Sequence, residues 1–126
     1  MSAQSRVGVR LIEENGRGVI AYNGFHIGEH IETCYTIQLD ATELPQIAGT
    51  NMDASLLIHP VDPEGALLAL GLVSLCGFSE LPNTRITARK DGPIGWLLDL
   101  HALRDISPGE QLTRHVRCDL WFDETD

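Results

Sequence analysis

The sequence predicts a mostly β domain of the α+β class, with short strands in several small sheets and one or two helical turns. Segments in which polar and apolar residues alternate are short, as in strands with one buried face. Gly, Pro and Asn recur between these segments and indicate frequent turns. A chain of 126 residues that is 43% hydrophobic and 21% charged can bury one core. We therefore expect a single domain spanning residues 1–126.

The first forty residues are predicted to form a meander. Alternation over residues 6–11 indicates a half-buried strand. The Gly-rich run at 15–18 predicts a turn before a strand at 19–22. A second short turn at 25–29 then leads into a β-rich run at 31–39.

The middle of the chain is predicted to be less regular. Residues 40–51 contain Pro and Gly that interrupt any period, so we expect a loop with one helical turn. Residues 54–59 are a short apolar strand candidate. An acidic cap at Asp62 followed by Pro63 is typical of a helix start and predicts a helix that continues over 65–70.

The last third is predicted to contain an antiparallel hairpin. The Asp-Gly pair at 91–92 favours a turn with positive φ between strands at 85–89 and 94–103. A further turn is expected at 108–109. The pattern over 111–122 fits neither a helix nor a strand.

Three segments, in order along the chain, resemble the signature segments of SET domains. Residues 15–21 (NGRGVIA) with 25–32 (FHIGEHIE) are similar to the family's "GxGvfA" and "i.kGe.i.e" stretch. Residues 68–84 (LALGLVSLCGFSELPNT) resemble "..lG.gslfNHS..PNa", and residues 102–113 (ALRDISPGEQLT) resemble "a.rdI..GEelt". Three motifs at compatible spacing are far more specific than a lone Gly-x-Gly.

The resemblance implies a minimal SET domain of viral or bacterial type, without zinc-binding flanking modules. Its fold would be the β-clip-like SET arrangement of small sheets, with a knot-like threaded C-terminal segment. We expect residues 111–120 to pass close to residues 74–84. Within these motifs Ser79, Pro82 and Asn83 match the family, and a structural role in supporting the threaded segment is favoured over direct ligand contact. Glu110 matches the family acid, whose usual role is to tie this segment to neighbouring backbone donors.

The resemblance also implies protein-lysine methylation with S-adenosylmethionine, but several positions depart from the family pattern. Val116 stands where the catalytic Tyr is expected, so the hydroxyl is lost, and a one-residue slip would place His115 there instead. Gly77 and Phe78 replace a polar Asn-His pair that helps to hold the cofactor. The cofactor-binding positions implied by the family are Gly16, Arg17, Gly18, Gly77, Phe78 and Trp121.

Each of these cofactor positions also has a plainer interpretation. The two glycines of the first motif fit close approach of the cofactor to the backbone, or a simple turn between strands. Trp121 fits stacking on adenine equally well as a core or lid position. With Phe78 in the pocket, we expect S-adenosylmethionine binding to be weak or absent.

Three hypotheses about function follow. The first is a catalytically degenerate SET domain that serves as a binding or assembly module, which the three substitutions favour. The second is an active protein-lysine N-methyltransferase with substituted active-site residues. The third is an unrelated β-rich domain whose motifs match by chance.

Charge and composition limit the kinds of partner that the chain is expected to bind. With a net charge of −9 and only nine Lys and Arg residues, the chain is not expected to bind nucleic acid. A basic or Lys-rich protein or peptide is the better match, although the charge also fits solubility alone. The longest apolar stretch, 66–76, is too short to span a bilayer, so we expect no membrane association and a cytoplasmic location. Self-association is left open.

Cysteine and histidine spacing predicts no metal site. The three cysteines lie far apart in the sequence and are expected to be inert thiols. His26 and His30 are four residues apart, but no third ligand accompanies them.

Overall fold

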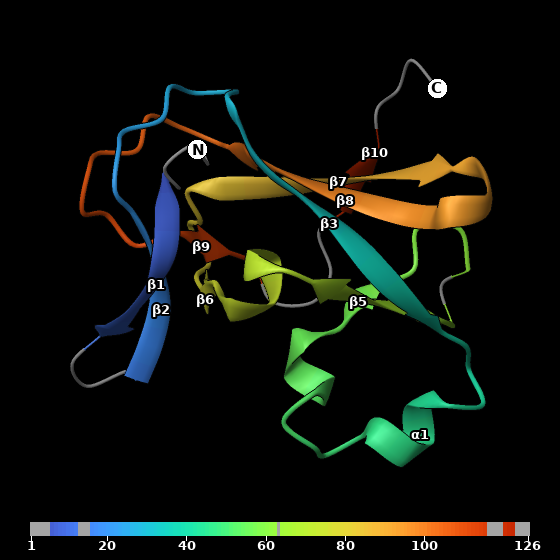
Figure 1. Cartoon of the computed structure of the whole chain (residues 1–126). Helices are drawn as coiled ribbons and strands as arrows, with labels where there is room; N and C mark the ends of the chain where they lie inside the picture. The colour runs from blue at the N-terminus through green and yellow to red at the C-terminus, as the bar shows by residue number, and fades with distance from the viewer. Residues whose placement is uncertain (1–5, 13–15, 63, 116–119, 123–126) are drawn as a thin grey trace, which may run out of the picture.

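The computed structural model describes residues 6–12, 16–62, 64–115 and 120–122 of the chain. A six-stranded sheet with the strand order β10-β7-β8-β3-β5-β4 forms its centre (Figure 1). The pairs within it are antiparallel except for β10 with β7. The strands span β3 His30–Leu39, β4 Leu57–Ile58, β5 Ala66–Leu70, β7 Thr84–Asp91, β8 Gly95–Ala102 and β10 Leu120–Phe122.

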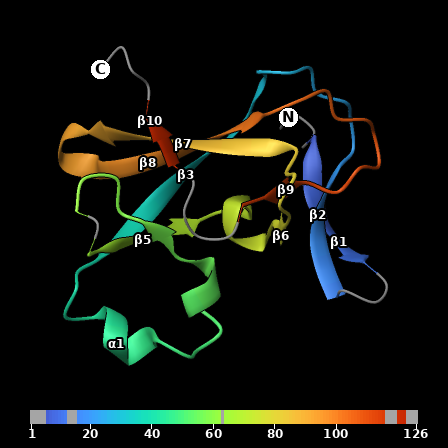
Figure 2. The same ribbon diagram turned by 180° about the vertical axis from the view of Figure 1, so that it is seen from behind.

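Two small sheets lie at one end of this central sheet. β1 (Val7–Ile12) and β2 (Gly16–Ala21) form an antiparallel pair. β6 (Gly77–Phe78) and β9 (Thr113–Arg114) form a parallel pair. Figures 1 and 2, seen from opposite sides, place β6 and β9 between the β1–β2 hairpin and the central sheet. The prediction of a mostly β domain with several small sheets is therefore confirmed.

The predicted hairpin in the last third of the chain is present. β7 and β8 pair from Thr84↔Ala102 to Asp91↔Gly95. The short 3-10 turn η4 (Gly92–Ile94) connects them, and Gly92 has the positive φ of 48° that the Asp-Gly pair favours.

The predicted helix over 65–70 is wrong. This segment is strand β5, which pairs with β3 on one side and β4 on the other. Leu67 and Ala69 are buried on one face of the strand, while on the other Ala66 is buried, Leu68 is half-buried and Leu70 is exposed, so the second face is partly covered. A short apolar run without alternation is typical of such a strand and equally typical of a buried helical segment, and here the pairing with β3 and β4 decides.

Two further strand boundaries differ from the prediction. Residues 16–18 are not in a turn, because they pair with Ile12, Leu11 and Arg10 as the first half of β2. Of the expected strand at 54–59, only Leu57–Ile58 forms β4, and the 3-10 turn η2 occupies Asp53–Ser55.

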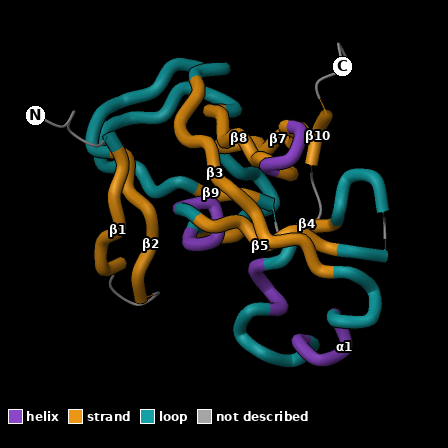
Figure 3. The backbone as a smooth tube through the Cα atoms, turned by 45° about the vertical axis from the view of Figure 1, so that its right-hand side comes forward, coloured by secondary structure: helices purple, strands orange, loops and turns teal. Residues whose placement is uncertain are grey.

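Residues 40–66 form a lobe at the edge of the central sheet. The single helical turn expected in the loop is α1 (Leu44–Ile47), with proline in its first turn. Together with η2 it packs over the ends of β3, β4 and β5 (Figure 3). This lobe has its own small apolar cluster, in which Leu44 and Ile47 pack against Leu39, Leu56 and Ala66.

The main core lies between the sheets and η3 (Leu72–Leu75). Its fully buried side chains include Val19, Leu67, Val73, Leu98, Leu100 and Leu112. Cys34 and Cys76, hereafter the buried thiols, are 2% and 5% exposed and unpaired, as expected for inert cysteines. Burial is the largest cause that raises the pKa of both thiols to about 12.

Candidate functional site

The three SET-like segments meet where residues 109–114 pass between β2 and β6. Gly109 N–H donates to Ala21 O at 2.7 Å, and Leu112 N–H donates to Val19 O at 2.8 Å, so this stretch runs beside β2. It then continues as β9, with Thr113 opposite Gly77 of β6. The expected approach of the C-terminal segment to residues 74–84 is confirmed for its described part, up to residue 115.

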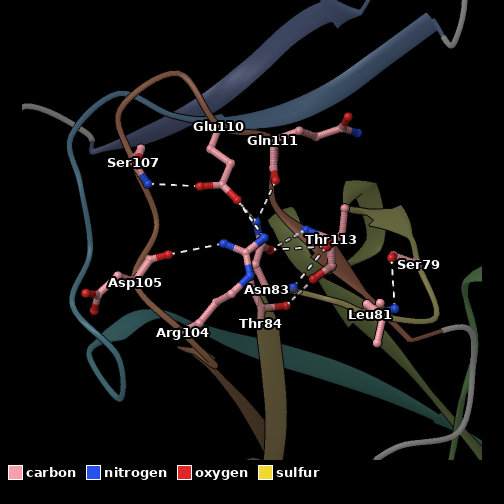
Figure 4. A network of polar contacts seen from close by, with 10 residues as sticks. All are labelled: Ser79, Leu81, Asn83, Thr84, Arg104, Asp105, Ser107, Glu110, Gln111 and Thr113. Atoms are coloured by element: carbon pink, nitrogen blue, oxygen red, sulfur yellow. Dashed lines mark hydrogen bonds and ion pairs between the residues drawn. The ribbon is translucent and has the colours of Figure 1, made fainter.

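Asn83 holds this C-terminal segment in place from the interior (Figure 4). Its side chain is 1% exposed. Asn83 Nδ2 donates to Gln111 O at 2.8 Å and to Glu110 Oε2 at 3.2 Å, while Thr113 N–H donates to Asn83 Oδ1 at 2.8 Å. One amide therefore satisfies a donor and two acceptors on the segment 110–113, which is the structural role predicted for it.

Glu110 completes the same network at its exposed side (Figure 4). Its carboxylate accepts a hydrogen bond from Ser107 N–H at 3.0 Å and lies 2.7 Å from Arg104 Nη2. The Ser107 N–H bond is the largest cause that lowers the pKa of Glu110, followed by the Arg104 and Asn83 hydrogen bonds, which outweigh the effect of burial. Its predicted structural role is confirmed.

Gln111 lies against two of the three glycine positions that the family pattern assigns to the cofactor, Gly18 and Gly77. A Cβ atom on Gly18 would lie 2.8 Å from Gln111 Nε2, and so would a Cβ atom on Gly77. Figure 4 shows the Gln111 side chain directed away from the Asn83 network. The amide of Gln111 therefore occupies the space between the Gly-x-Gly strand and β6.

Arg114 is buried without a carboxylate partner among the described residues. The residue is 0% exposed, and its guanidinium donates to Val73 O at 3.0 Å, His115 O at 3.1 Å and Ser55 O at 3.4 Å. Its Cζ lies 4.8 Å from the centroid of the Phe78 ring. Burial lowers the pKa of Arg114, while the three carbonyls and the ring offset part of the desolvation.

The residues predicted to bind the cofactor or act on substrate are only partly brought together. Gly16 and Arg17 are exposed and Gly18 is buried on β2, while Phe78 is 47% exposed on β6. His115 is half-buried directly after β9. Trp121 lies in β10 opposite Thr87 of the central sheet, and Val116 lies outside the described residues.

Sequence reasoning missed Gln111, Arg114 and a polar cluster on the central sheet. In that cluster Arg89 Nε donates to Asp99 Oδ2 at 2.6 Å, and Thr33 donates to Asp99 Oδ1 at 2.6 Å. His30 packs edge-on against His101 with ring centroids 5.5 Å apart. The sequence places Thr33 and Asp99 in predicted strands, but it does not give the register that sets them opposite each other.

In the described ranges, no group of three His, Cys, Asp or Glu residues is arranged to hold a metal ion. None of the helices that the structure describes is long and apolar enough to cross a bilayer.

Comparison with known proteins identifies the fold. No protein-family model matches the chain, and no curated protein matches it by sequence. Among solved structures, a candidate histone methyltransferase of Plasmodium falciparum is similar at a TM-score of 0.72 and 22% identity, over 88% of this chain and 92% of that chain. The Neurospora histone lysine methyltransferase DIM-5 is similar at a TM-score of 0.66 and 19% identity, over 95% of this chain and 52% of that one.

A third similar structure is the Chaetomium thermophilum polycomb repressive complex 2 bound to S-adenosylmethionine, at a TM-score of 0.69 and 18% identity. This match covers 90% of the chain described here and 15% of that chain. At these identities the likeness establishes the fold alone. The chain therefore has the SET-domain fold, as its three segments predicted, and a chance match of motifs is excluded.

Proposed function

We propose that this chain is a catalytically degenerate SET domain that serves as a binding module for a basic, Lys-rich partner. The observation that carries the first half is the position of Gln111. Its Nε2 would lie only 2.8 Å from a Cβ atom on Gly18 or on Gly77, and the neighbouring polar pair of the family is replaced by Gly77 and Phe78. These residues fit S-adenosylmethionine poorly, because the Gln111 amide occupies space beside both glycines and Phe78 supplies an aromatic ring in place of a polar side chain.

The net charge of −9 supports the proposed binding of a basic, Lys-rich partner. Clustered carboxylates attract Lys-rich segments and increase their association rate. A cytoplasmic location is part of the proposal, and the two unpaired buried thiols are compatible with a reducing compartment.

Calorimetric titration with S-adenosylmethionine tests the loss of the cofactor site. We expect no binding by the wild type and none by the Gln111→Asn variant, which keeps an amide there. Gln111→Ala combined with Gly77→Asn and Phe78→His removes the obstructing amide and restores the polar pair, so binding is expected to return in part. Radiolabelled methyl transfer to Lys-rich peptides should be absent in the wild type and in Val116→Tyr, because the hydroxyl alone does not restore the cofactor site.

An active methyltransferase with substituted residues is the competing function, and the fold it shares with histone methyltransferases favours it. Low-micromolar S-adenosylmethionine binding by the wild type, or clear turnover, would support this alternative and overturn the degenerate one.

A further inference from the structure

A cavity of about 450 Å³ lies in the lobe of residues 40–66, between α1, η2, β4 and the start of β5. Leu44, Pro45 and Ala48 line it from the helix side, and Leu56 and Ile58 line it from the sheet side. Asp53 is the one charged side chain among its described lining residues. The volume is within the range of about 300–1,000 Å³ that is typical of ligand sites.

This lobe carries several carboxylates and no Lys or Arg. The sequence contains no Lys or Arg between Arg17 and Arg85. Residues 40–66 contribute five acidic side chains: Asp40, Glu43, Asp53, Asp62 and Glu64. With His counted as neutral, the lobe therefore carries five of the nine net negative charges without any Lys or Arg of its own.

The carboxylates lie next to the residues that line the cavity. Glu43 immediately precedes α1, whose Leu44 is a lining residue. Asp62 Oδ2 would be 3.4 Å from a Cβ atom on Gly65, another lining residue. Asp40, Glu43 and Asp62 accept hydrogen bonds from backbone N–H groups in the same loop. Asp40, Glu43, Asp62 and Glu64 form no ion pair within the part of the chain that the structure describes.

The rim of the cavity is apolar and accessible. Ile58 lines the cavity and is 42% exposed, and Met52, next to η2, is 45% exposed. An apolar cavity next to carboxylates is typical of an interface in which a buried anchor supplies affinity and the charges select the partner. A second copy of this chain is disfavoured as the occupant, because it would bring another acidic lobe to the same place.

We propose that this cavity takes an apolar side chain of a basic peptide, with the Lys or Arg residues that flank the anchor lying against the surrounding carboxylates. This inference rests on the proposed binding function and assigns its site. The cavity lies apart from the Gly-x-Gly hairpin of the cofactor region, because α1 and the β1–β2 hairpin lie at different ends of the molecule (Figures 1 and 3).

Fluorescence anisotropy with the full chain and labelled peptides tests the proposal. The probes have the sequence Lys-Lys-X-Lys-Lys, with X as Leu or Ala, and Glu-Glu-Leu-Glu-Glu is the charge-reversed control. We expect the Leu peptide to bind best, the Ala peptide to bind at least about fivefold more weakly from the lost burial of the anchor, and the acidic peptide not to bind.

Two variants test the cavity and its charges separately. Ala48→Phe fills the cavity from its exposed rim and should abolish the preference for Leu over Ala. Glu43→Gln/Glu64→Gln removes two charges with little change of shape and should weaken binding about fivefold at low salt. The matched control Glu80→Gln/Asp91→Asn removes the same charge from exposed positions elsewhere and should change binding less than twofold.

The outcomes separate this site from the proposed function. If basic peptides bind but neither variant matters, the binding function stands and the cavity is the wrong site. If no basic peptide binds, both the proposed site and the proposal of a basic partner are refuted. The titration with S-adenosylmethionine still tests separately whether the cofactor site is lost. If Ala48→Phe instead converts a dimer into a monomer in sedimentation, the cavity belongs to an interface between copies and the proposal is refuted.

Discussion

Replacing Asn83 tests whether one buried amide joins the C-terminal segment to the rest of the fold. In Asn83→Ala, Thr113 N–H and Gln111 C=O lose partners that now lie 2.8 Å away. Each buried polar group left unpaired costs about 1–3 kcal/mol. Because Thr113 and Gln111 are only half-buried, water recovers part of this, and we expect a loss of about 3 kcal/mol in the free energy of unfolding. That is a large share of the 5–15 kcal/mol typical of a domain.

The Asn83→Asp variant makes the prediction more specific. It keeps the acceptor for Thr113 N–H but places a carboxylate oxygen where Nδ2 lies 3.2 Å from Glu110 Oε2. At an effective dielectric constant of about 20, two like charges at that distance repel by roughly 5 kcal/mol before relaxation. We expect this variant to be less stable than Asn83→Ala at pH 7, and Glu110→Gln to be less harmful in its background than in the wild type.

Urea unfolding followed by tryptophan fluorescence measures both variants. Asn23→Ala, an exposed position with no side-chain hydrogen bond among the described residues, is the control and should change stability by less than about 0.5 kcal/mol. An Asn83→Ala loss below about 1 kcal/mol, or an Asn83→Asp protein more stable than Asn83→Ala at pH 7, would refute the network argument.

Three further predictions concern acid stability, thiol reactivity and a buried histidine. Burial raises the pKa of Asp99, but hydrogen bonds from Arg89 and Thr33 outweigh it and the pKa is lowered, as it is for Glu110. The stabilisation from these two carboxylates is therefore fully present above their unfolded-state pKa values near 4 and is lost as the pH falls through their lower folded-state pKa values. In urea unfolding from pH 2.5 to 7, Asp99→Asn should reduce the fall of the midpoint concentration at acid pH. An unchanged fall would contradict this. With Cys118→Ser, the two buried thiols should not react with a thiol reagent at pH 8 in the native protein and should both react in denaturant, and native labelling within minutes would show that they are accessible. His59 Nδ1 accepts hydrogen bonds from the backbone N–H groups of residues 61 and 62, both at 3.0 Å. His59→Leu should therefore lower the free energy of unfolding by about 2 kcal/mol, and His59→Asn, which keeps an acceptor, by less. Equal losses would argue against this role.

The sequence predicted the fold where local patterns and motif order carry the information. The Asp-Gly pair at 91–92 predicted the β7–β8 hairpin, since its turn geometry depends on neighbouring residues alone. The matching of Asn83 and Glu110 to a known pattern predicted the network around the C-terminal segment. The first prediction came from a local pattern, and the second came from the resemblance to SET domains.

The errors and omissions arise where tertiary context decides. The apolar run 66–70 carries no alternation, so its pairing between β3 and β4 could not be read from the sequence. Arg114 would be placed on the surface by its charge, since arginine is rarely fully buried. The Gln111 amide reaches Gly18 and Gly77 only through the pairing of residues 109–114 with both β2 and β6. Such a contact between distant segments leaves no trace in local pattern.

Arg114 connects the two regions that the proposals separate. Its guanidinium donates to Val73 O in η3, beside the cofactor region, and to Ser55 O in η2, within the acidic lobe. A guanidinium presents its donors in a rigid planar fork, so these carbonyls are held at a fixed spacing by one side chain. Arg114 has no carboxylate partner among the described residues, and a buried charge without a counterion is costly. The three carbonyls and the Phe78 ring therefore offset part of its desolvation. Packing therefore explains why an aromatic residue occupies position 78, where the family pattern has a polar one. The negative face of the Phe78 ring contacts the Arg114 guanidinium.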